Sequence, residues 1–207
     1  MATSIPSIDE SRTQAILSSV AGFPFLLMLS LAWLAAGGVS YLVPTSLAGW
    51  IYPLAGLPAM GAAIALERRI GYVPAPQPDP FVALGLQVLF IQVLACPAVA
   101  LVWDSSPEYV PVAFAAVVGA HFLPFEWMYR TRLYRFLGVV IAVGPYVLAI
   151  LFRERALHYT GFFVGPVMLL GAFIARSHAA ATWRAYQRAR SESTSPDAAA
   201  VAGGRIR

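Results

Sequence analysis

The chain has 207 residues, of which 59% are hydrophobic and only 12% are charged, and its mean hydropathy is +0.70. Soluble domains carry about 25% charged residues, so this composition argues against a water-soluble domain and favours a protein surrounded by lipid. The formal net charge is +4, and all 14 basic side chains are arginine. Because these arginines fall between apolar segments and near the C-terminus, we expect no nucleic-acid partner.

Six apolar segments follow one another along the chain, and each is long enough to cross a bilayer. A helix needs about 20 apolar residues to span a hydrocarbon core about 30 Å thick. The predicted helices cover about residues 15–43, 47–66, 81–103, 110–129, 133–152 and 157–175. Barrel strands would alternate in polarity over about 10 residues, which these segments do not. We therefore predict an all-α fold: a polytopic integral membrane protein with a bundle of six transmembrane helices.

The polar ends of the chain set the predicted domain organisation. Residues 1–13 form a cytoplasmic N-terminal segment, residues 14–177 the six-helix transmembrane domain, and residues 178–207 a cytoplasmic extension of the last helix with a disordered tail. The first apolar run is too long for the core of a signal peptide, so we expect it to be retained. Four prolines between Pro74 and Pro80 predict an extended surface loop.

The distribution of arginines predicts the orientation in the membrane. With six crossings, both termini lie on one side, and that side collects twelve arginines. The opposite side has only Arg153 and Arg155. Since cytoplasmic loops are enriched in basic residues, we expect both termini in the cytoplasm and the protein in the inner or plasma membrane. Trp50, Trp103 and Trp127 lie near segment ends, where tryptophan prefers the membrane interface.

Every apolar segment contains a proline, which removes a backbone hydrogen bond and kinks a helix. These residues are Pro24, Pro53, Pro58, Pro97, Pro124, Pro145 and Pro166. They fit either hinges along a transport path or static kinks that shape a bundle. We favour static kinks, because no segment pair resembles the paired half-helices of a transporter.

Small residues at three- or four-residue spacing predict close helix packing. They are Gly161, Gly165, Gly171 and Ala175 on the last helix, Gly56, Ala59 and Ala63 on the second, and Ala115 and Gly119 on the fourth. Such residues let helix backbones approach closely in lipid. The pattern leaves open whether the contacts lie within one bundle or join copies in a homo-oligomer.

Polar residues within the apolar segments predict a buried polar centre. His121, Gln92 and Ser30 lie at similar depths, and polar groups at that depth should face the interior and bond to one another. We predict a contact between His121 and Gln92, direct or through water, with Tyr146 as a fourth member. Three roles stay open for His121: structural hydrogen bonding, which we favour, a proton or substrate path, and catalysis.

One charged pair is predicted at the membrane interface. Glu126 precedes Arg130 by four residues, the favourable order for an ion pair on a helix. We predict no catalytic residue, no metal ligand and no cofactor. His158 and His178 belong near opposite interfaces, Cys96 is the only cysteine, and the common catalytic and metal motifs are missing from the sequence.

The fourth helix carries a short Gly-x-His-Phe-x-Pro element, formed by Gly119, His121, Phe122 and Pro124. In this element and the basic, aromatic stretch that follows, the chain resembles an uncharacterised family of small multi-pass bacterial membrane proteins. The resemblance implies a membrane location and no known activity, and it adds no catalytic residue.

We expect a non-enzymatic membrane protein, a small carrier or a structural or accessory subunit, with a polar centre around His121. The alternative is a membrane-embedded enzyme that acts on a lipid or isoprenoid substrate. An interfacial cluster of Glu67, Asp79 and Glu126 would favour the enzyme, and a water-filled cavity reaching His121 would favour transport. The expected partners are membrane lipids and, through the small-residue faces, further copies of the chain.

Overall fold

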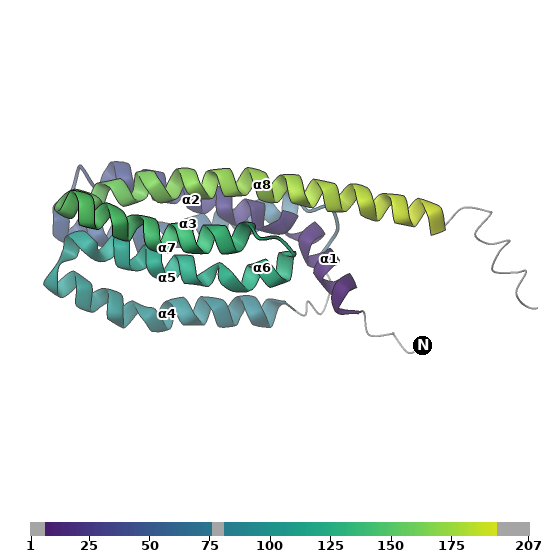
Figure 1. Cartoon of the computed structure of the whole chain (residues 1–207), viewed down its shortest axis with the longest axis horizontal. Coiled ribbons are helices and arrows are strands. Elements are labelled where there is room, and N and C mark those ends of the chain that lie inside the picture. Colours follow the sequence, from purple (N-terminus) through teal and green to yellow (C-terminus); the bar gives the residue numbers. More distant parts are fainter. Residues whose placement is uncertain (1–6, 76–80, 194–207) are drawn as a thin grey trace, which may run out of the picture.

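The computed structural model describes residues 7–75 and 81–193, and within them the chain is helical with no strand. Most helices run along one long axis (Figure 1): α2 (Phe23–Val39), α3 (Thr45–Ile70), α4 (Val82–Ser105), α5 (Val110–His121), α6 (Leu123–Tyr129), α7 (Leu133–Phe152) and α8 (Ala156–Ser193). The helix α1 (Ile8–Ser18) instead crosses one end of the bundle at an angle. We call this the α1 end. The all-helical prediction is confirmed for the described residues.

Five helical stretches of the described residues are long and apolar enough to cross a membrane. They are Val20–Val39, Thr45–Ile70, Leu84–Ser105, Pro107–Tyr129 and Leu133–Glu192. The last covers 60 residues because it contains both α7 and α8, which lie side by side in Figure 1 and are joined by the short turn Arg153–Arg155. The 20 residues of α7 alone measure about 30 Å, which matches the hydrocarbon thickness of a bilayer.

The single helix predicted over residues 15–43 is wrong, because a left-handed turn separates α1 from α2. Val20, Ala21 and Gly22 have φ angles of 52°, 50° and 76°. Only glycine adopts such angles freely, and a β-branched valine rarely does. The hydroxyl of Tyr134 on α7 donates a hydrogen bond to the Ala21 carbonyl. That bond and the surrounding burial hold the turn, so α1 leaves the direction of the bundle.

Two of the prolines that were predicted to kink helices instead start them. Pro24 lies in the first turn of α2 and Pro124 in the first turn of α6, where a missing backbone N–H leaves no helical bond unmade. The helix predicted over 110–129 is therefore interrupted at Phe122. The remaining predicted prolines lie inside helices: Pro53, Pro58, Pro97, Pro145 and Pro166.

The backbones of two helix pairs touch at glycine. A Cβ atom added to Gly161 of α8 would lie 2.6 Å from the carbonyl oxygen of Trp33 and 2.7 Å from the Cα of Gly37, both in α2. A Cβ added to Gly119 of α5 would lie 2.6 Å from the carbonyl oxygen of Gly138 in α7. These small residues therefore make contacts inside the chain, as expected for close packing in lipid.

Not every small residue in the predicted packing faces is used in this way. Gly165 packs against the backbone and side chains of α2, and Gly171 packs against Leu137 of α7. In α3, Ala59 and Ala63 are buried, but a Cβ added to Gly56 would meet no atom within 4 Å. Gly56 therefore lies outside the packing face of its own helix.

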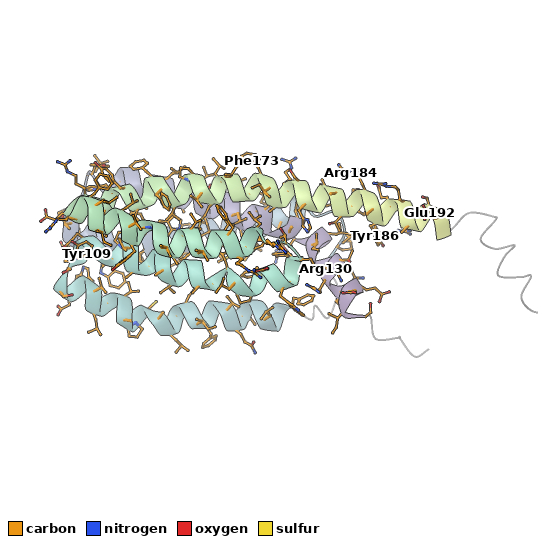
Figure 2. The ribbon with its side chains drawn as sticks, viewed as in Figure 1. Tyr109, Arg130, Phe173, Arg184, Tyr186 and Glu192 are labelled. Carbon is orange, nitrogen blue, oxygen red and sulfur yellow. The ribbon has the colours of Figure 1, made fainter. Side chains whose placement is uncertain are left out.

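The last helix projects beyond the rest of the bundle at the α1 end. Its 38 residues correspond to about 57 Å. Arg184, Tyr186 and Glu192 lie on the projecting part, next to the end that carries Arg130 (Figure 2). The ring of Trp183 stacks between Tyr72 and Tyr186, with centroid distances of 5.5 and 5.7 Å. Aromatic stacking thus fastens the base of this projection to the residues that follow α3.

Candidate functional site

The histidine at the break between α5 and α6 lies among aromatic rings. His121 is the last residue of α5, and its ring centroid is 5.8 Å from that of Phe122 and 5.3 Å from that of Phe125. The imidazole also interacts with the backbone of Val88 in α4. Its Nδ1 atom is buried and has no hydrogen-bond partner. His121 therefore packs between α5 and α4 with part of its bonding capacity unused.

Hydrogen bonds do not join the predicted polar centre within the described residues. Ser30 is fully buried in α2, and its hydroxyl donates to the Leu27 carbonyl at 2.9 Å. Among the described residues, no hydrogen bond joins His121, Gln92, Ser30 and Tyr146 to one another. Tyr146 is 61% exposed. It follows the buried Pro145, and one residue further along a helix is a rotation of about 100°, so its side chain points outward.

The predicted ion pair between Glu126 and Arg130 is replaced by two other pairs. Glu126 accepts a hydrogen bond from Nε of Arg135 at 2.7 Å. Arg130 has a φ of 52° and ends α6. It therefore leaves the helical position that would place it beside Glu126, and it pairs instead with Asp9 of α1.

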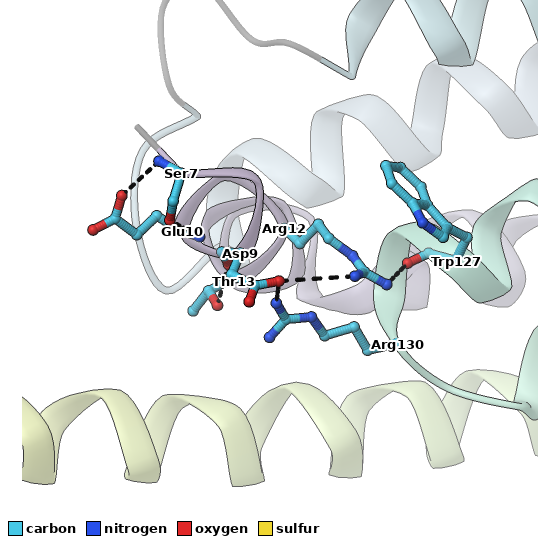
Figure 3. A network of polar contacts seen from close by, with 7 residues as sticks. All are labelled: Ser7, Asp9, Glu10, Arg12, Thr13, Trp127 and Arg130. Carbon is cyan, nitrogen blue, oxygen red and sulfur yellow. Dashed lines mark hydrogen bonds and ion pairs between the residues drawn. The ribbon is translucent and has the colours of Figure 1, made fainter. Parts of the chain in front are cut away.

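A polar network joins α1 to the end of α6 (Figure 3). Arg12 donates a hydrogen bond to the carbonyl of Trp127, and its guanidinium lies 4.7 Å from the centre of the Trp127 ring. Asp9 pairs with Arg130 and lies 3.9 Å from Arg12. A capping box between Ser7 and Glu10 starts α1 and fixes the direction of this turn. The network orients two arginines of α1 and α6 around one carboxylate.

Beside this network lies a hollow of about 470 Å³. Four arginines line it: Arg12, Arg130, Arg132 and Arg135. The remaining lining is Leu123, Glu126, Trp127 and Thr131. We call this the arginine pocket. Its volume lies in the range of about 300 to 1,000 Å³ that is common for small-molecule sites.

Tyrosine and histidine side chains hold the helices together next to this pocket. Ser19 Oγ donates to the hydroxyl of Tyr129 at 3.1 Å, and Nε2 of His178 lies 2.9 Å from the Tyr129 carbonyl oxygen. The hydrogen bond from Tyr134 to Ala21 lies in the same region. His178 therefore joins α8 to α6 and has a structural role.

A second polar group lies at the opposite end of the bundle. His158 Nδ1 lies 2.7 Å from Ser40 Oγ, and the rings of His158 and Tyr41 stack with centroids 3.9 Å apart. A hollow of about 330 Å³ adjoins them and is lined by Thr45, Glu108, Glu154, Arg155, Leu157 and His158. The polar chemistry of the described residues is thus concentrated at the two ends of the bundle.

Of the three acidic residues whose clustering would favour an enzyme, two lie within the described residues: Glu67 at the end of α3 and Glu126 in α6. Glu126 is engaged by Arg135, and Asp79 lies outside the residues that the structure describes. Within residues 7–75 and 81–193, no group of three or more histidine, cysteine, aspartate or glutamate side chains could hold a metal ion. Of the two hollows described above, the arginine pocket has the larger number of charged side chains.

Comparison with known protein families identifies the family of this chain. A protein-family model described as a family of unknown function, DUF7010, matches residues 8–177. The chain belongs to this family. The part matched to DUF7010 begins at α1 and ends within α8, so it includes both the bundle and the arginine pocket. No curated protein and no solved structure matches the chain. The expected membership of an uncharacterised family is confirmed, while the bacterial membrane location of that family and the Gly-x-His-Phe-x-Pro marker stay predictions.

Two features of the DUF7010 chain were missed in the sequence. One is the separate α1, although Ser7 and Glu10 have the spacing of a capping box, which signals a helix start ahead of the apolar run. The other is the approach of Arg12 to Arg130, which are more than 100 residues apart in sequence. No local pattern encodes that second contact, because it depends on the turn between α1 and α2.

Proposed function

We propose that this chain is a six-span integral membrane protein of the inner or plasma membrane with a non-enzymatic role as a structural or accessory subunit. The observation that carries this proposal is the backbone contact at Gly37 and Gly161, repeated at Gly119 and Gly138. Helices in such contact form a packed interior, whereas a carrier needs a path for its substrate between helices. The side chain of Ser30 bonds to its own helix and not to His121 within the described residues, which points the same way.

The proposed orientation places the α1 end in the cytoplasm. The arginines of the pocket lie at that end, and Arg153 and Arg155 lie at the turn between α7 and α8. This distribution agrees with the excess of basic residues that cytoplasmic loops carry. The count of six spans follows from α2, α3, α4, α5 with α6, α7 and α8 as successive crossings. Membrane lipids surround the bundle, and Gly56 remains an open small position that a second copy of the chain could cover.

Thiol accessibility tests both parts of this proposal. In a Cys96→Ala background, single substitutions Asp104→Cys, Ser191→Cys and Ser30→Cys are treated with a small membrane-impermeant thiol reagent in intact cells and in permeabilised cells. Asp104→Cys should react in intact cells, and Ser191→Cys only after permeabilisation. Ser30→Cys should stay unreacted in both, because Ser30 is fully buried.

The outcomes separate orientation from role. Exchange of the Asp104→Cys and Ser191→Cys patterns would overturn the orientation and leave the packed bundle standing. Reaction of Ser30→Cys from one side would show water in the interior and favour a carrier. The near-isosteric change from serine to cysteine keeps the α2 and α8 contact intact, so a positive reaction would not reflect misfolding.

A further inference from the structure

The arginine pocket carries more positive charge than its own carboxylates neutralise. Four arginines line it, and Glu126 is the one acidic residue of the lining. Asp9 adds a second carboxylate from α1. Arg132 is exposed and forms no ion pair within the described residues. An excess of arginine in a concave site favours an anionic ligand.

We propose that the arginine pocket binds a phosphate group, carried by an anionic lipid headgroup or by a free phosphate. Guanidinium groups present planar, paired donors that match the oxygens of a phosphate. Arg12 is held in place by the Trp127 carbonyl, its side chain is only 16% exposed, and its Nε is buried without a hydrogen-bond partner. A guanidinium that is already fixed loses little conformational freedom when it binds an anion.

The start of α7 adds to the positive potential. This helix of 20 residues begins at Leu133, directly after the pocket residues Thr131 and Arg132. The N-terminus of a helix has a partial positive charge and unpaired N–H groups, which favour phosphate. Thr131 already accepts the N–H of Leu133 at 3.3 Å, which fixes this end of the helix beside the pocket.

The position of the pocket suits a lipid phosphate as well as a soluble one. It lies where the apolar length of α7 begins and where Trp127 is exposed. Tryptophan prefers the headgroup region of a bilayer, so the pocket lies at the depth of lipid phosphates. Arginine clusters at this depth bind anionic lipids electrostatically.

Asp9 acts as an internal competitor for the proposed ligand. Its carboxylate contacts Arg130 and lies 3.9 Å from Arg12, yet it is 75% exposed. It therefore occupies a place that a phosphate oxygen would take on Arg130 (Figure 3). Removing its charge should strengthen phosphate binding, whereas removing pocket arginines should weaken it.

The test uses the purified full-length chain in detergent, with binding measured by isothermal titration calorimetry. The probes are dioctanoyl phosphatidylglycerol, inorganic phosphate, and dioctanoylglycerol, which has the same acyl chains without the phosphate. Binding of phosphatidylglycerol alone identifies a lipid as the source of the phosphate, and binding of inorganic phosphate identifies a soluble anion. Failure of both, or equal binding of dioctanoylglycerol, would overturn the proposal.

Variants test whether the phosphate probes bind in the arginine pocket. The double variant Arg132→Gln with Arg135→Gln should weaken binding by roughly tenfold or more, since charge-assisted hydrogen bonds to phosphate are strong. The control double variant Arg184→Gln with Arg188→Gln removes the same charge from the exposed projection of α8 and should change binding by less than about twofold. Asp9→Asn should tighten binding. Equal losses in the two double variants would show nonspecific charge attraction and overturn the assignment. Unfolding curves of each variant confirm that the fold is retained.

Discussion

The inner helices α2 and α8 and the outer helices α3 and α4 all contain membrane-length apolar segments, but they are packed very differently. In the apolar window of each span, 56% of residues are buried in Val20–Val39, compared with 22% in α3 and 12% in α4. The inner pair meets backbone to backbone at Gly37 and Gly161. In α3 and α4, added Cβ atoms at Gly56 and Gly85 would have no neighbour within 4 Å.

For a bundle in lipid, as we propose for this chain, this difference indicates which contacts determine the centre. Burying an apolar side chain against another helix gains little there, because lipid tails are as apolar as leucine. Close contact of small residues and satisfied backbone groups must supply the specificity. The position of a helix therefore depends on where its small residues meet a partner. Substitution of a glycine that meets a partner backbone, such as Gly161, and of one that meets open space, such as Gly56, should then have opposite effects.

The largest effect should come from Gly161→Ala. The new methyl group would overlap backbone atoms of Trp33 and Gly37, which have no rotamer to change. Overpacking of this kind costs about 2 to 3 kcal/mol. The free energy of unfolding in mixed micelles, followed by circular dichroism, measures this loss.

The matched control is Gly56→Ala in α3. The added methyl group has open space, and alanine favours a helix over glycine by up to about 1 kcal/mol. Its unfolding free energy should be unchanged or higher. Equal destabilisation by both substitutions would show that α3 is packed as tightly as the inner pair and would remove the distinction between them.

A smaller loss of stability is expected at the turn between α1 and α2. Tyr134→Phe removes the hydroxyl that donates to the Ala21 carbonyl, both groups being buried. A buried carbonyl without its partner costs about 1 to 2 kcal/mol. Thermal unfolding in detergent should show this loss, together with earlier proteolysis of α1.

Tyr146→Phe serves as the comparison for this tyrosine. Tyr146 lies on the outer surface of the same helix, so this substitution should change stability by less than about 0.5 kcal/mol. A similar loss for the two variants would mean that Tyr146 has a polar partner and belongs inside the bundle.

The sequence predicted the membrane-length helices well because their signal is local. About twenty consecutive apolar residues with few charges identify a span without knowledge of its neighbours. The two wrong helices have a common cause. Residues 15–43 and 110–129 each looked continuous because hydropathy does not report the backbone angle of Val20 or the break at Phe122. In both places a proline that starts a helix was interpreted as a kink.

The candidate site was less accessible to sequence reasoning. Depth along a helix can be counted from residue numbers, and that count placed His121 and Ser30 together. The direction that each side chain faces depends on helix rotation and on which helices are neighbours, and the sequence encodes neither directly. The arginine pocket combines a residue of α1 with residues around α6, so it exists only after the turn at Ala21 has folded α1 back.

The smallest change in the free energy of unfolding should come from His121→Leu, where α5 packs against the outer helix α4. The buried Nδ1 of His121 has no hydrogen-bond partner, whereas the imidazole contacts the backbone of Val88. Leucine removes the unsatisfied nitrogen, and this gain offsets the loss of one hydrogen bond, which is worth about 1 kcal/mol. The unfolding free energy should therefore stay the same or rise by less than about 1 kcal/mol. His121→Ala should instead lower it by about 1 to 2 kcal/mol, because the loosely packed edge collapses only in part around the missing ring. If His121→Leu were as damaging as Gly161→Ala, the contact between the imidazole and the backbone of Val88 would contribute far more than expected, and polar contacts rather than packing would hold the outer helices.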